Sequence, residues 1–287
     1  MRVLLTGGSG QVGAFVAPAL AAAGHEVVHL ARRPPAAGEW ARWALGDAGP
    51  LPRAEALVHL AFAHVSGRYR GGEGEDAEGF LAANLGGSLA LVAAARAGGV
   101  RRVVFLSSRA VYGDGRRGEA LREDDALAPD SLYGAMKRDV EAAVLAAPGG
   151  VALRATGVYG LAPGAATHKW TGLFAEYLAG RPVAPRRATE VHGDDLAAAV
   201  VLMLARPAAE GAFNVSDLMV DRGDLLAAVQ ARTGAAGAPP GPDPGPAPGE
   251  MATERLRALG WRPGGAARLA GFLDALFGPP EEAAPPA

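Results

Sequence analysis

Short apolar segments alternate with longer, alanine- and leucine-rich stretches through the first half of the chain. The short segments are β-branched or aliphatic, as in strands buried on both faces of a parallel sheet, and they cover residues 3–5, 27–30, 56–61, 102–106 and 151–154. The longer stretches have helical spacing and stop at glycine or proline, and they cover residues 12–23, 77–97 and 131–146. This alternation predicts an α/β fold with a Rossmann-like, doubly wound parallel sheet.

The alternation loosens after residue 160, which predicts a second, smaller lobe. Helices are expected at residues 171–180, 194–205, 222–233 and 251–259, and a short strand at 212–215. The proline- and glycine-rich stretch 238–249 predicts an irregular surface connection. We expect a dinucleotide-binding domain in residues 1–157, with 190–206 returning to it, an interleaved substrate lobe in 158–189 and 207–278, and a frayed tail at 279–287.

A glycine-rich loop joins the first strand to the first helix. Gly7, Gly10 and Gly13 permit a tight turn, a close approach of the backbone to a pyrophosphate, and close packing of helix on strand. Glycine is abundant in this chain, so the spacing alone is a weak signal. Its position between a strand and a helix favours dinucleotide binding at the helix N-terminus over a structural loop.

Two arginines follow the second strand, where an NAD-binding Rossmann fold usually carries an acidic residue. Arg32 and Arg33 suit a 2′-phosphate, so NADP(H) is favoured as cofactor and NAD(H) is the alternative. Both arginines could instead be solvated surface residues. Asp47, next to Ala48 and after a further candidate strand at 43–45, is either an adenine contact or a turn aspartate.

Tyr133 and Lys137 lie four residues apart on a predicted helix, so they share one face. A nearby ammonium lowers the pKa of a phenol and makes it a usable general acid or base for hydride transfer at an alcohol. The chain has 28 basic residues, of which only Lys137 and Lys169 are lysines. Lys137 is therefore improbable as a generic surface cation, although a solvated ion-pairing position is the alternative.

Ser107 and Ser108 close the predicted buried strand that begins at residue 102. Ligands of open α/β sheets bind at the carboxyl ends of the strands, so these hydroxyls face the expected site. The chain lacks the G-x-S-x-G turn of hydrolases, and a serine here is expected to orient a reacting oxygen, not to attack it.

Composition removes several other classes of function. The net charge of −2 gives no footprint for nucleic acid or an anionic membrane, and the absence of cysteine removes disulfides, thiolate nucleophiles and iron–sulfur clusters. The 6 histidines form no metal-binding spacing, so no metal is expected. We expect no signal-peptide core and no apolar run of 18 residues, and hence a soluble cytoplasmic protein.

These motifs, taken in order, resemble the extended short-chain dehydrogenases/reductases of the NAD-dependent epimerase/dehydratase family. The resemblance is carried by TGGSGQVG at 6–13, NLGGS at 84–88, FLSSRAVYG at 105–113, YGAMK at 133–137, LRATGVYG at 153–160, VHGDDLA at 191–197 and LGWRP at 259–263. It implies that Ser108 and Tyr133 are catalytic, that Lys137 holds the nicotinamide ribose, that Asn84 supports the site, and that the protein is a homodimer. The implied cofactor contacts are Gly7, Gly10, Gln11, Val12, Gly13, Arg32, Arg33, Asp47, Ala48, Leu60, Ala61, Ser107, Lys137, Thr156 and Val158.

The chain departs from this family pattern in places that concern the substrate. Dehydratases of the family carry an Asp-Glu pair where this chain has Arg109 and Ala110, so dehydration is disfavoured. The arginine-aspartate expected before VHGDDLA is replaced by Arg186-Arg187, which puts a full nucleotide-diphosphate site in doubt. Candidate substrate contacts, each as readily explained by a surface or packing role, are His64, Arg109, His168, Lys169, Trp170 and Arg187.

The expected function is an NADP(H)-preferring oxidoreductase that transfers hydride to or from a hydroxyl-bearing carbon of a sugar, sugar derivative or nucleotide sugar. Two alternatives stay open. The first is a nucleotide-sugar epimerase with tightly bound NAD, which would use the same residues. The second is a non-catalytic dinucleotide sensor, which the presence of Tyr133 and Lys137 argues against.

Overall fold

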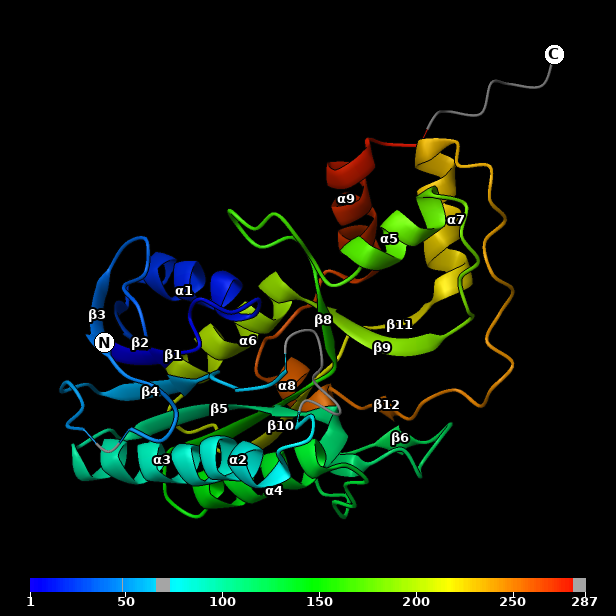
Figure 1. The fold of residues 1–287 in the computed structure, drawn as a ribbon. Coiled ribbons are helices and arrows are strands. Elements are labelled where there is room, and N and C mark those ends of the chain that lie inside the picture. The colour runs from blue at the N-terminus through cyan, green and yellow to red at the C-terminus, as the bar shows by residue number, and fades with distance from the viewer. Residues whose placement is uncertain (48, 66–72, 281–287) are drawn as a thin grey trace.

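A sheet of 7 parallel strands forms the centre of the molecule (Figure 1). The computed structural model describes residues 1–47, 49–65 and 73–280. The strand order is β10-β7-β5-β4-β1-β2-β3, which confirms the predicted doubly wound fold. The order reverses between β1 and β4, where sheets of this kind bind ligands. The strands are β1 (Arg2–Thr6), β2 (Glu26–Ala31), β3 (Glu39–Arg42), β4 (Ala56–His59), β5 (Arg102–Ser108), β7 (Gly150–Ala155) and β10 (Gly211–Val215).

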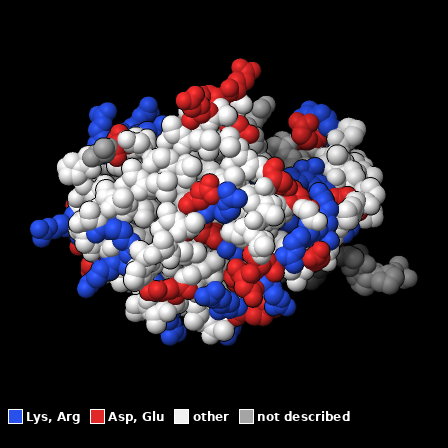
Figure 2. All heavy atoms as spheres, turned by 90° about the horizontal axis from the view of Figure 1, so that it is seen from below, with Lys and Arg blue, Asp and Glu red and all other residues white. Residues whose placement is uncertain are grey.

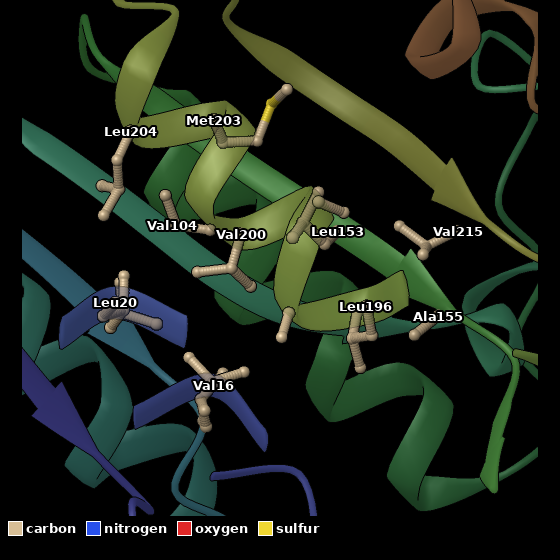
Figure 3. Packing of buried hydrophobic residues seen from close by; sticks show 14 of the residues in the cluster. Val16, Leu20, Val104, Leu153, Ala155, Leu196, Val200, Met203, Leu204 and Val215 are labelled. Atoms are coloured by element: carbon tan, nitrogen blue, oxygen red, sulfur yellow. The ribbon is translucent and has the colours of Figure 1, made fainter. Parts of the chain in front are cut away.

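Helices cover both faces of this sheet. Helices α1 (Gly13–Ala22) and α6 (Gly193–Ala205) lie on one face, and α2 (Ala77–Leu81), α3 (Gly87–Ala97) and α4 (Leu132–Leu145) lie on the other (Figure 1). In Figure 3, Leu196 and Val200 of α6 point toward the aliphatic side chains of β5 and β7, with α1 beside them. Apolar side chains on both faces of the strands thus explain the continuous apolar segments in the sequence.

The predicted helix at 77–97 is interrupted by a π-helical turn at Ala82–Gly86. The stretch is 21 residues long with a mean hydropathy of 1.4 in its most apolar window, so by length and composition alone it could cross a membrane, contrary to the expectation that no such run exists. Leu91 and Val92 are buried in the cluster against the sheet, which is the packing of a core helix. The π turn places Asn84 in the interior.

The smaller lobe is built on a three-stranded sheet in the order β11-β9-β8. Its aromatic core joins this sheet to three helices, with Tyr159, Trp170, Phe174 and Phe272 at the centre. A separate two-stranded sheet pairs β6 with β12. These elements are β6 (Ala120–Leu121), β8 (Gly157–Tyr159), β9 (Arg187–His192), β11 (Leu218–Asp221), β12 (Glu250–Met251), α5 (Thr171–Leu178), α7 (Arg222–Thr233), α8 (Glu254–Ala258) and α9 (Gly265–Phe277).

The expected boundary between the lobes was wrong in two places. The strand expected at 212–215 in the small lobe is β10, which pairs with β7 at the edge of the large sheet because its side chains bury against α6 and β7. Leu256 and Trp261 also pack in the large core. The strand expected at 43–45 lies at 39–42 instead. Residues 238–249 contain neither helix nor strand, as predicted, and most of the expected frayed tail, 281–287, lies outside the described residues.

Charged side chains of both signs are interspersed over the face seen from below the sheet (Figure 2). This distribution agrees with the net charge of −2. The described part of this face has no broad field of one sign, which non-specific binding of nucleic acid would require.

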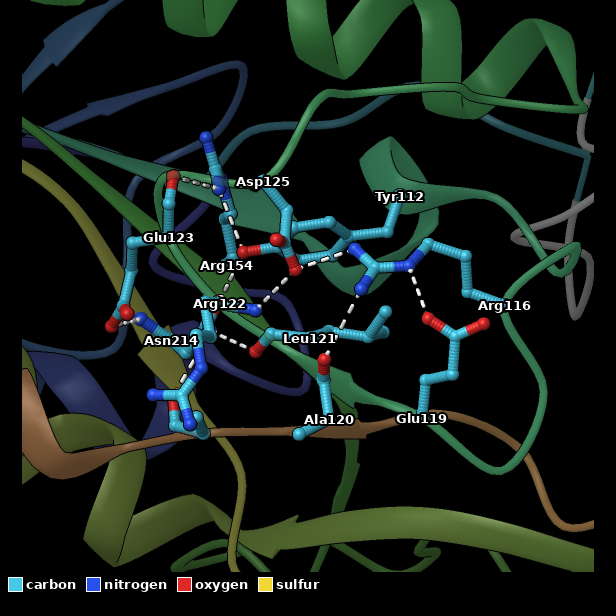
Figure 4. A network of polar contacts seen from close by, with 11 residues as sticks. Tyr112, Arg116, Glu119, Ala120, Leu121, Arg122, Glu123, Asp125, Arg154 and Asn214 are labelled. Carbon is cyan, nitrogen blue, oxygen red and sulfur yellow. Dashed lines mark hydrogen bonds and ion pairs between the residues drawn. The ribbon is translucent and has the colours of Figure 1, made fainter.

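A buried polar network joins β7, β10, α4 and the 3₁₀ turn Arg109–Tyr112. The Arg154 guanidinium donates to Glu141 Oε1 (2.5 Å from Nη2) and to the Tyr112 hydroxyl (2.7 Å), which itself donates to Asn214 Oδ1 (2.8 Å). Figure 4 shows Arg154, Tyr112 and Asn214 converging from separate elements. Each of these side chains is at most 5% exposed, so they form hydrogen bonds with one another in place of water.

Removing one member of the Arg154–Glu141 pair should be far more damaging than removing both. Arg154→Met leaves a buried carboxylate without its counter-ion and should lower the free energy of unfolding by about 3–5 kcal/mol. The double variant Arg154→Met/Glu141→Leu should recover much of that loss. Urea unfolding followed by circular dichroism measures both. Arg181→Met, which breaks an exposed pair with Glu176, is the matched control and should change little. A double variant as unstable as the sum of its single variants would contradict this account.

Candidate active site

The glycine loop fits a dinucleotide because side chains are excluded from it. Gly7 has φ of +70°, and a Cβ there would lie 2.7 Å from the Ala61 nitrogen. A Cβ on Gly13 would overlap the carbonyl oxygen of Gly7. The backbone of Leu60 and Ala61 therefore packs directly on the loop, and α1 starts against it. This leaves the backbone amides and the helix N-terminus to hold a pyrophosphate.

The buried His59 supports this loop through Thr6. Thr6 Oγ1 accepts hydrogen bonds from the Leu60 and Ala61 nitrogens (3.1 Å each) and lies 2.7 Å from His59 Nδ1. His59 Nε2 lies 2.9 Å from Ser88 Oγ. Burial, assisted by the charge of Lys137, lowers the pKa of His59 to about 3, so its ring is neutral. Sequence reasoning missed this group, although a histidine at the end of an apolar strand was a signal for it.

The small lobe touches the glycine loop through Gln11. Its amide Nε2 donates to the Val158 carbonyl (3.3 Å) at the start of the three-stranded sheet. Thr156, just before β8, is nearly buried, and its nitrogen donates to the Val215 carbonyl (3.1 Å). The expected cofactor contacts Gln11, Thr156 and Val158 are thus brought together where the two lobes meet.

Arg32 and Arg33 are both exposed immediately beyond β2. Within residues 1–47, 49–65 and 73–280, neither guanidinium forms an ion pair. Asp47 caps a turn by accepting from the Ala44 nitrogen (2.7 Å), and it also lines a cavity of about 180 Å³ with Trp43. Its position is therefore compatible with both expected roles, as an adenine contact and as a turn aspartate. Ala48 lies outside the described residues.

Tyr133 is positioned by the start of α4. Ser131 caps this helix by accepting from the Gly134 nitrogen (3.2 Å), and Tyr133 lies in its first turn. A Cβ on Gly134 would lie 2.5 Å from the Ala110 carbonyl oxygen. Glycine at this position lets α4 pack against the 3₁₀ turn Arg109–Tyr112, which begins directly after Ser108. The first turn of α4 and the end of β5 are therefore adjacent.

Lys137 carries its ammonium into an apolar pocket. The residue is 4% exposed, and Nζ donates to the Leu106 carbonyl (2.8 Å). The same nitrogen lies 4.7 Å from the ring centroid of Phe105, 5.3 Å from that of Phe62, and 5.8 Å from that of Tyr133. Burial lowers the pKa of Lys137 to about 7. The ring faces offset part of the desolvation cost of the charge.

Asn84 supports the site by holding the segment after β4. Its Oδ1 accepts from the Ala63 nitrogen (2.7 Å), and its Nδ2 donates to the Ala63 carbonyl (2.8 Å). The neighbouring Phe62 ring packs edge-on against Tyr133, with centroids 5.1 Å apart. His64 stacks on the Phe62 ring, with centroids 5.2 Å apart, so one ring separates this expected substrate contact from Tyr133.

The two serines at the end of β5 have different tasks. Ser108 Oγ accepts from the Ala110 nitrogen (3.2 Å) and starts the turn that faces α4. Ser107 was expected to bind the cofactor, but its hydroxyl is buried and donates to Glu141 Oε2 (2.7 Å). Side chains alternate across a strand, so neighbouring serines face opposite sides of the sheet.

Several of the expected substrate contacts make hydrogen bonds or ring contacts within the protein. Arg109 bonds the Gly249 carbonyl (3.1 Å) and Asp114, and Arg187 bonds Asp243 and pairs with Asp221. Trp170 stacks on Tyr159 at 5.1 Å. These three residues hold loops and the small-lobe core. The sequence could not reveal the loop contacts, because Gly249 lies 140 residues from Arg109 and Asp243 lies 56 residues from Arg187.

His168 and Lys169 lie next to one another but have different surroundings. His168 packs against Phe272, with centroids 5.1 Å apart, and its Nδ1 accepts from the Trp170 nitrogen. Lys169 Nζ bonds both carboxylate oxygens of the buried Glu190. Among the described residues, no group of three or more side chains is arranged to hold a metal ion.

Comparison with known proteins places this site in a family. The model of the NAD dependent epimerase/dehydratase family matches residues 3–216. A UDP-glucose 4-epimerase of Streptomyces lividans is 34% identical over 155 residues, which are 49% of this chain and 45% of that relative. A UDP-glucose 4-epimerase of Klebsiella pneumoniae is 36% identical over 131 residues, 40% of this chain and 94% of that relative. The match thus spans less than half the length of the Streptomyces enzyme.

Solved structures extend the likeness over nearly the whole chain. The UDP-glucose 4-epimerase of Thermus thermophilus in complex with NAD is 29% identical, with a TM-score of 0.72 over 92% of this chain and 94% of that one. A short-chain dehydrogenase/reductase superfamily protein of Agrobacterium tumefaciens with bound NAD is 27% identical, with a TM-score of 0.77 over 96% and 97%. Because the family model matches most of the chain and the likeness to these structures covers nearly all of it, the chain belongs to the NAD-dependent epimerase/dehydratase family of extended short-chain dehydrogenases/reductases.

Proposed function

We propose that this protein transfers hydride between a nicotinamide dinucleotide and a hydroxyl-bearing carbon of a sugar or sugar derivative. The observation that carries the proposal is the Lys137 ammonium, buried beside the Tyr133 ring with no carboxylate contact among the described residues. Such a charge does not stabilise the fold, because burying an ammonium without a counter-ion costs free energy. A family member that uses a tyrosine as general acid and base needs the ammonium, because the positive charge lowers the pKa of the phenol.

The chain's own residues supply the proton chemistry. Tyr133 takes the proton of the substrate hydroxyl or returns it, and the Lys137 ammonium stabilises the phenolate form. The Ser108 hydroxyl, at the carboxyl end of β5, orients the reacting oxygen. When bound along the glycine loop, the dinucleotide supplies a hydride donor or acceptor. Gly7, Gly10, Gly13, Gln11 and the backbone of Leu60 and Ala61 would hold it.

The net reaction that we propose is an oxidation or reduction with an exchanging NADP(H). The exposed Arg32 and Arg33 support this, because no acidic side chain follows β2 directly and two guanidinium groups suit a 2′-phosphate. The second candidate is a nucleotide-sugar epimerase with tightly bound NAD, which the names and the bound NAD of the relatives favour. Dehydration is disfavoured because Arg109 and Ala110 carry no carboxylate. A homodimer and a cytoplasmic location stay predictions.

Tyr133→Phe should remove the proton donor and leave the cofactor site intact. We expect turnover to fall by about 10²- to 10⁴-fold, the usual contribution of a positioned acid or base. NADPH affinity, measured by fluorescence titration, should stay within about twofold. Tyr177→Phe, which removes a hydroxyl bound to the Gly237 carbonyl far from α4, is the control. Turnover that survives in Tyr133→Phe would refute the catalytic role.

Substitution of the two arginines after β2 tests the cofactor preference. The double variant Arg32→Ala/Arg33→Ala should weaken NADPH binding by about tenfold or more, since each charge-assisted hydrogen bond contributes about 1.5–3 kcal/mol. NADH binding should not change. The nucleotide released on denaturing the purified wild-type protein is the companion measurement. Stoichiometric NAD in that sample would favour the epimerase and contradict our use of Arg32 and Arg33.

Lys137→Met should abolish turnover and change how stability depends on pH. Lysine has an ordinary pKa of 10.5, whereas that of folded Lys137 is about 7, so protonation favours the unfolded chain. This penalty is full below pH 7 and fades as the pH rises toward 10.5. Relative to wild type, the variant should therefore gain a few kcal/mol in unfolding free energy on going from pH 10 to pH 6. Denaturant unfolding at both pH values tests this, and a difference independent of pH would disprove it.

A further inference from the structure

The side chain of His29, in β2, packs against the glycine loop. A Cβ added to Gly8 would lie 2.7 Å from His29 Nδ1, and one added to Gly38 would lie 3.5 Å from Nε2. The imidazole ring is therefore held between the glycine loop and the connection from β2 to β3. It is half-buried, and it forms no hydrogen bond or ion pair with any of the described residues, so its nitrogens are available to a ligand.

The register of the large sheet places His29 beside the expected ribose position. In NAD-binding folds, an acidic residue at the end of the second strand binds the ribose hydroxyls. Ala31 occupies that end here, and alternation along β2 puts it on the same face as His29. Arg42 of β3 lies opposite Ala31 in the register, so its side chain starts from this face too. His29, Ala31 and Arg42 therefore border the position at which a ribose 2′-phosphate would lie.

Positive charge gathers around this position. Arg32 and Arg33 follow Ala31 directly, and Arg42 is exposed at the end of β3. None of these three guanidinium groups forms an ion pair in the part of the chain that the structure describes. The glycine loop and α1, residues 7–22, carry no charged side chain. Like charges without a counter-ion repel one another, and a bound anion relieves that repulsion.

The carboxylates of β3 and of the segment after it are engaged elsewhere. By the register of β2 and β3, Glu39 lies on the other face of the sheet, where it pairs with Arg2. Asp47 accepts a hydrogen bond from the Ala44 nitrogen (2.7 Å). Neither carboxylate pairs with His29, so these two groups leave the positive charge on the His29 face without a counter-ion.

A histidine at this position can respond to an anion by binding a proton. Burial lowers the pKa of His29 from its usual value of 6.5, and no charged group contributes to the shift, so the ring is neutral at pH 7.5 when no anion is bound. A phosphate dianion beside the ring would raise this pKa, because it favours the imidazolium. Arginine contacts alone have the opposite effect, since they favour the phosphate dianion over its protonated form. The direction of proton exchange on binding therefore distinguishes a histidine ligand from arginine ligands alone.

We propose that His29 is a ligand of the 2′-phosphate of NADP(H) and takes up a proton from solvent when the cofactor binds. The assignment rests on the proposed preference for NADP(H). The imidazolium would join the guanidinium groups of Arg32 and Arg42 around the phosphate, and its charge would offset part of the negative charge of the dianion. NADH carries a hydroxyl in place of this phosphate, so its binding leaves the ring neutral. The affinity for NADPH, unlike that for NADH, therefore falls as the pH rises.

Proton uptake tests this assignment without any need for turnover. NADPH is titrated calorimetrically at pH 7.5 in two buffers of different ionisation enthalpy, and the difference in binding heat gives the number of protons taken up. We expect about half a proton or more for the wild type and none for His29→Gln, with NADH giving none for either protein. His25→Gln, at the opposite end of β2 from Ala31, is the matched control and should behave as the wild type does. Absence of uptake by the wild type, or uptake that persists in His29→Gln, overturns the proposal.

The pH dependence of affinity is a second measurement, which the wild-type protein alone can supply. Between pH 6.5 and pH 8.5 the Kd of NADPH should rise by about tenfold, and that of NADH by less than about twofold. In His29→Gln the Kd of NADPH should change by less than about threefold over this range. Adenosine 2′,5′-bisphosphate, compared with 5′-AMP, should show the same contrast, because it carries the phosphate without the nicotinamide. An affinity for NADPH that does not fall with rising pH contradicts the assignment.

Turnover separates this proposal from the proposed function. Hydride transfer to NADP⁺ with the same cofactor KM in wild type and His29→Gln at both pH values would refute the role of His29 and leave hydride transfer standing. Binding of NADH alone would refute the role of His29 together with the NADP(H) preference. Proton uptake that depends on His29, without turnover of any sugar or sugar derivative, would uphold the role of His29 and count against the function.

Discussion

The buried ion pair between Arg154 and Glu141 is the contact on which the geometry of the active site depends. It joins β7 to α4, and Glu141 also accepts the Ser107 hydroxyl from β5. Glu141 lies one helical turn beyond Lys137, and Ser107 directly precedes Ser108. The pair therefore fixes Lys137 and Ser108, two side chains of the candidate site, relative to each other. Other packings of α4 are disfavoured because they would leave a buried charge without its partner.

Lys137 shows the opposite use of a buried charge. Its ammonium contacts a carbonyl oxygen and three ring faces, and burial brings its pKa down to about 7. The free-energy cost of burying this charge is offset by contacts elsewhere in the fold, including the well-paired network around Arg154. Such an arrangement is typical of an active site, where a group is kept in an unfavourable environment because the chemistry requires it.

The large sheet and the small lobe contribute different parts of the candidate site. The glycine loop, His59 and the end of β5 belong to the large sheet and are set by backbone packing that few side chains could alter. The small lobe adds a cavity lined in part by Glu190 and meets the large sheet at β8, where the Val158 carbonyl accepts from Gln11. A family can therefore keep one reaction and change its substrate by altering side chains in the small lobe alone.

The sequence by itself determined the parallel strands of the large sheet up to β7 and the glycine loop, and it predicted Tyr133 and Lys137 as a functional pair. Continuous apolar strands, glycine positions and the spacing of Tyr133 and Lys137 are local signals that survive without a partner. Only the tertiary structure decided that β10 joins the large sheet, that Ser107 faces Glu141, and that Arg109 and Arg187 hold loops. It also decided that Arg186 and Arg222 share one cavity. The physical reason is that these contacts join residues tens of positions apart, so their partners are set by packing and burial, which leave no local pattern in the chain.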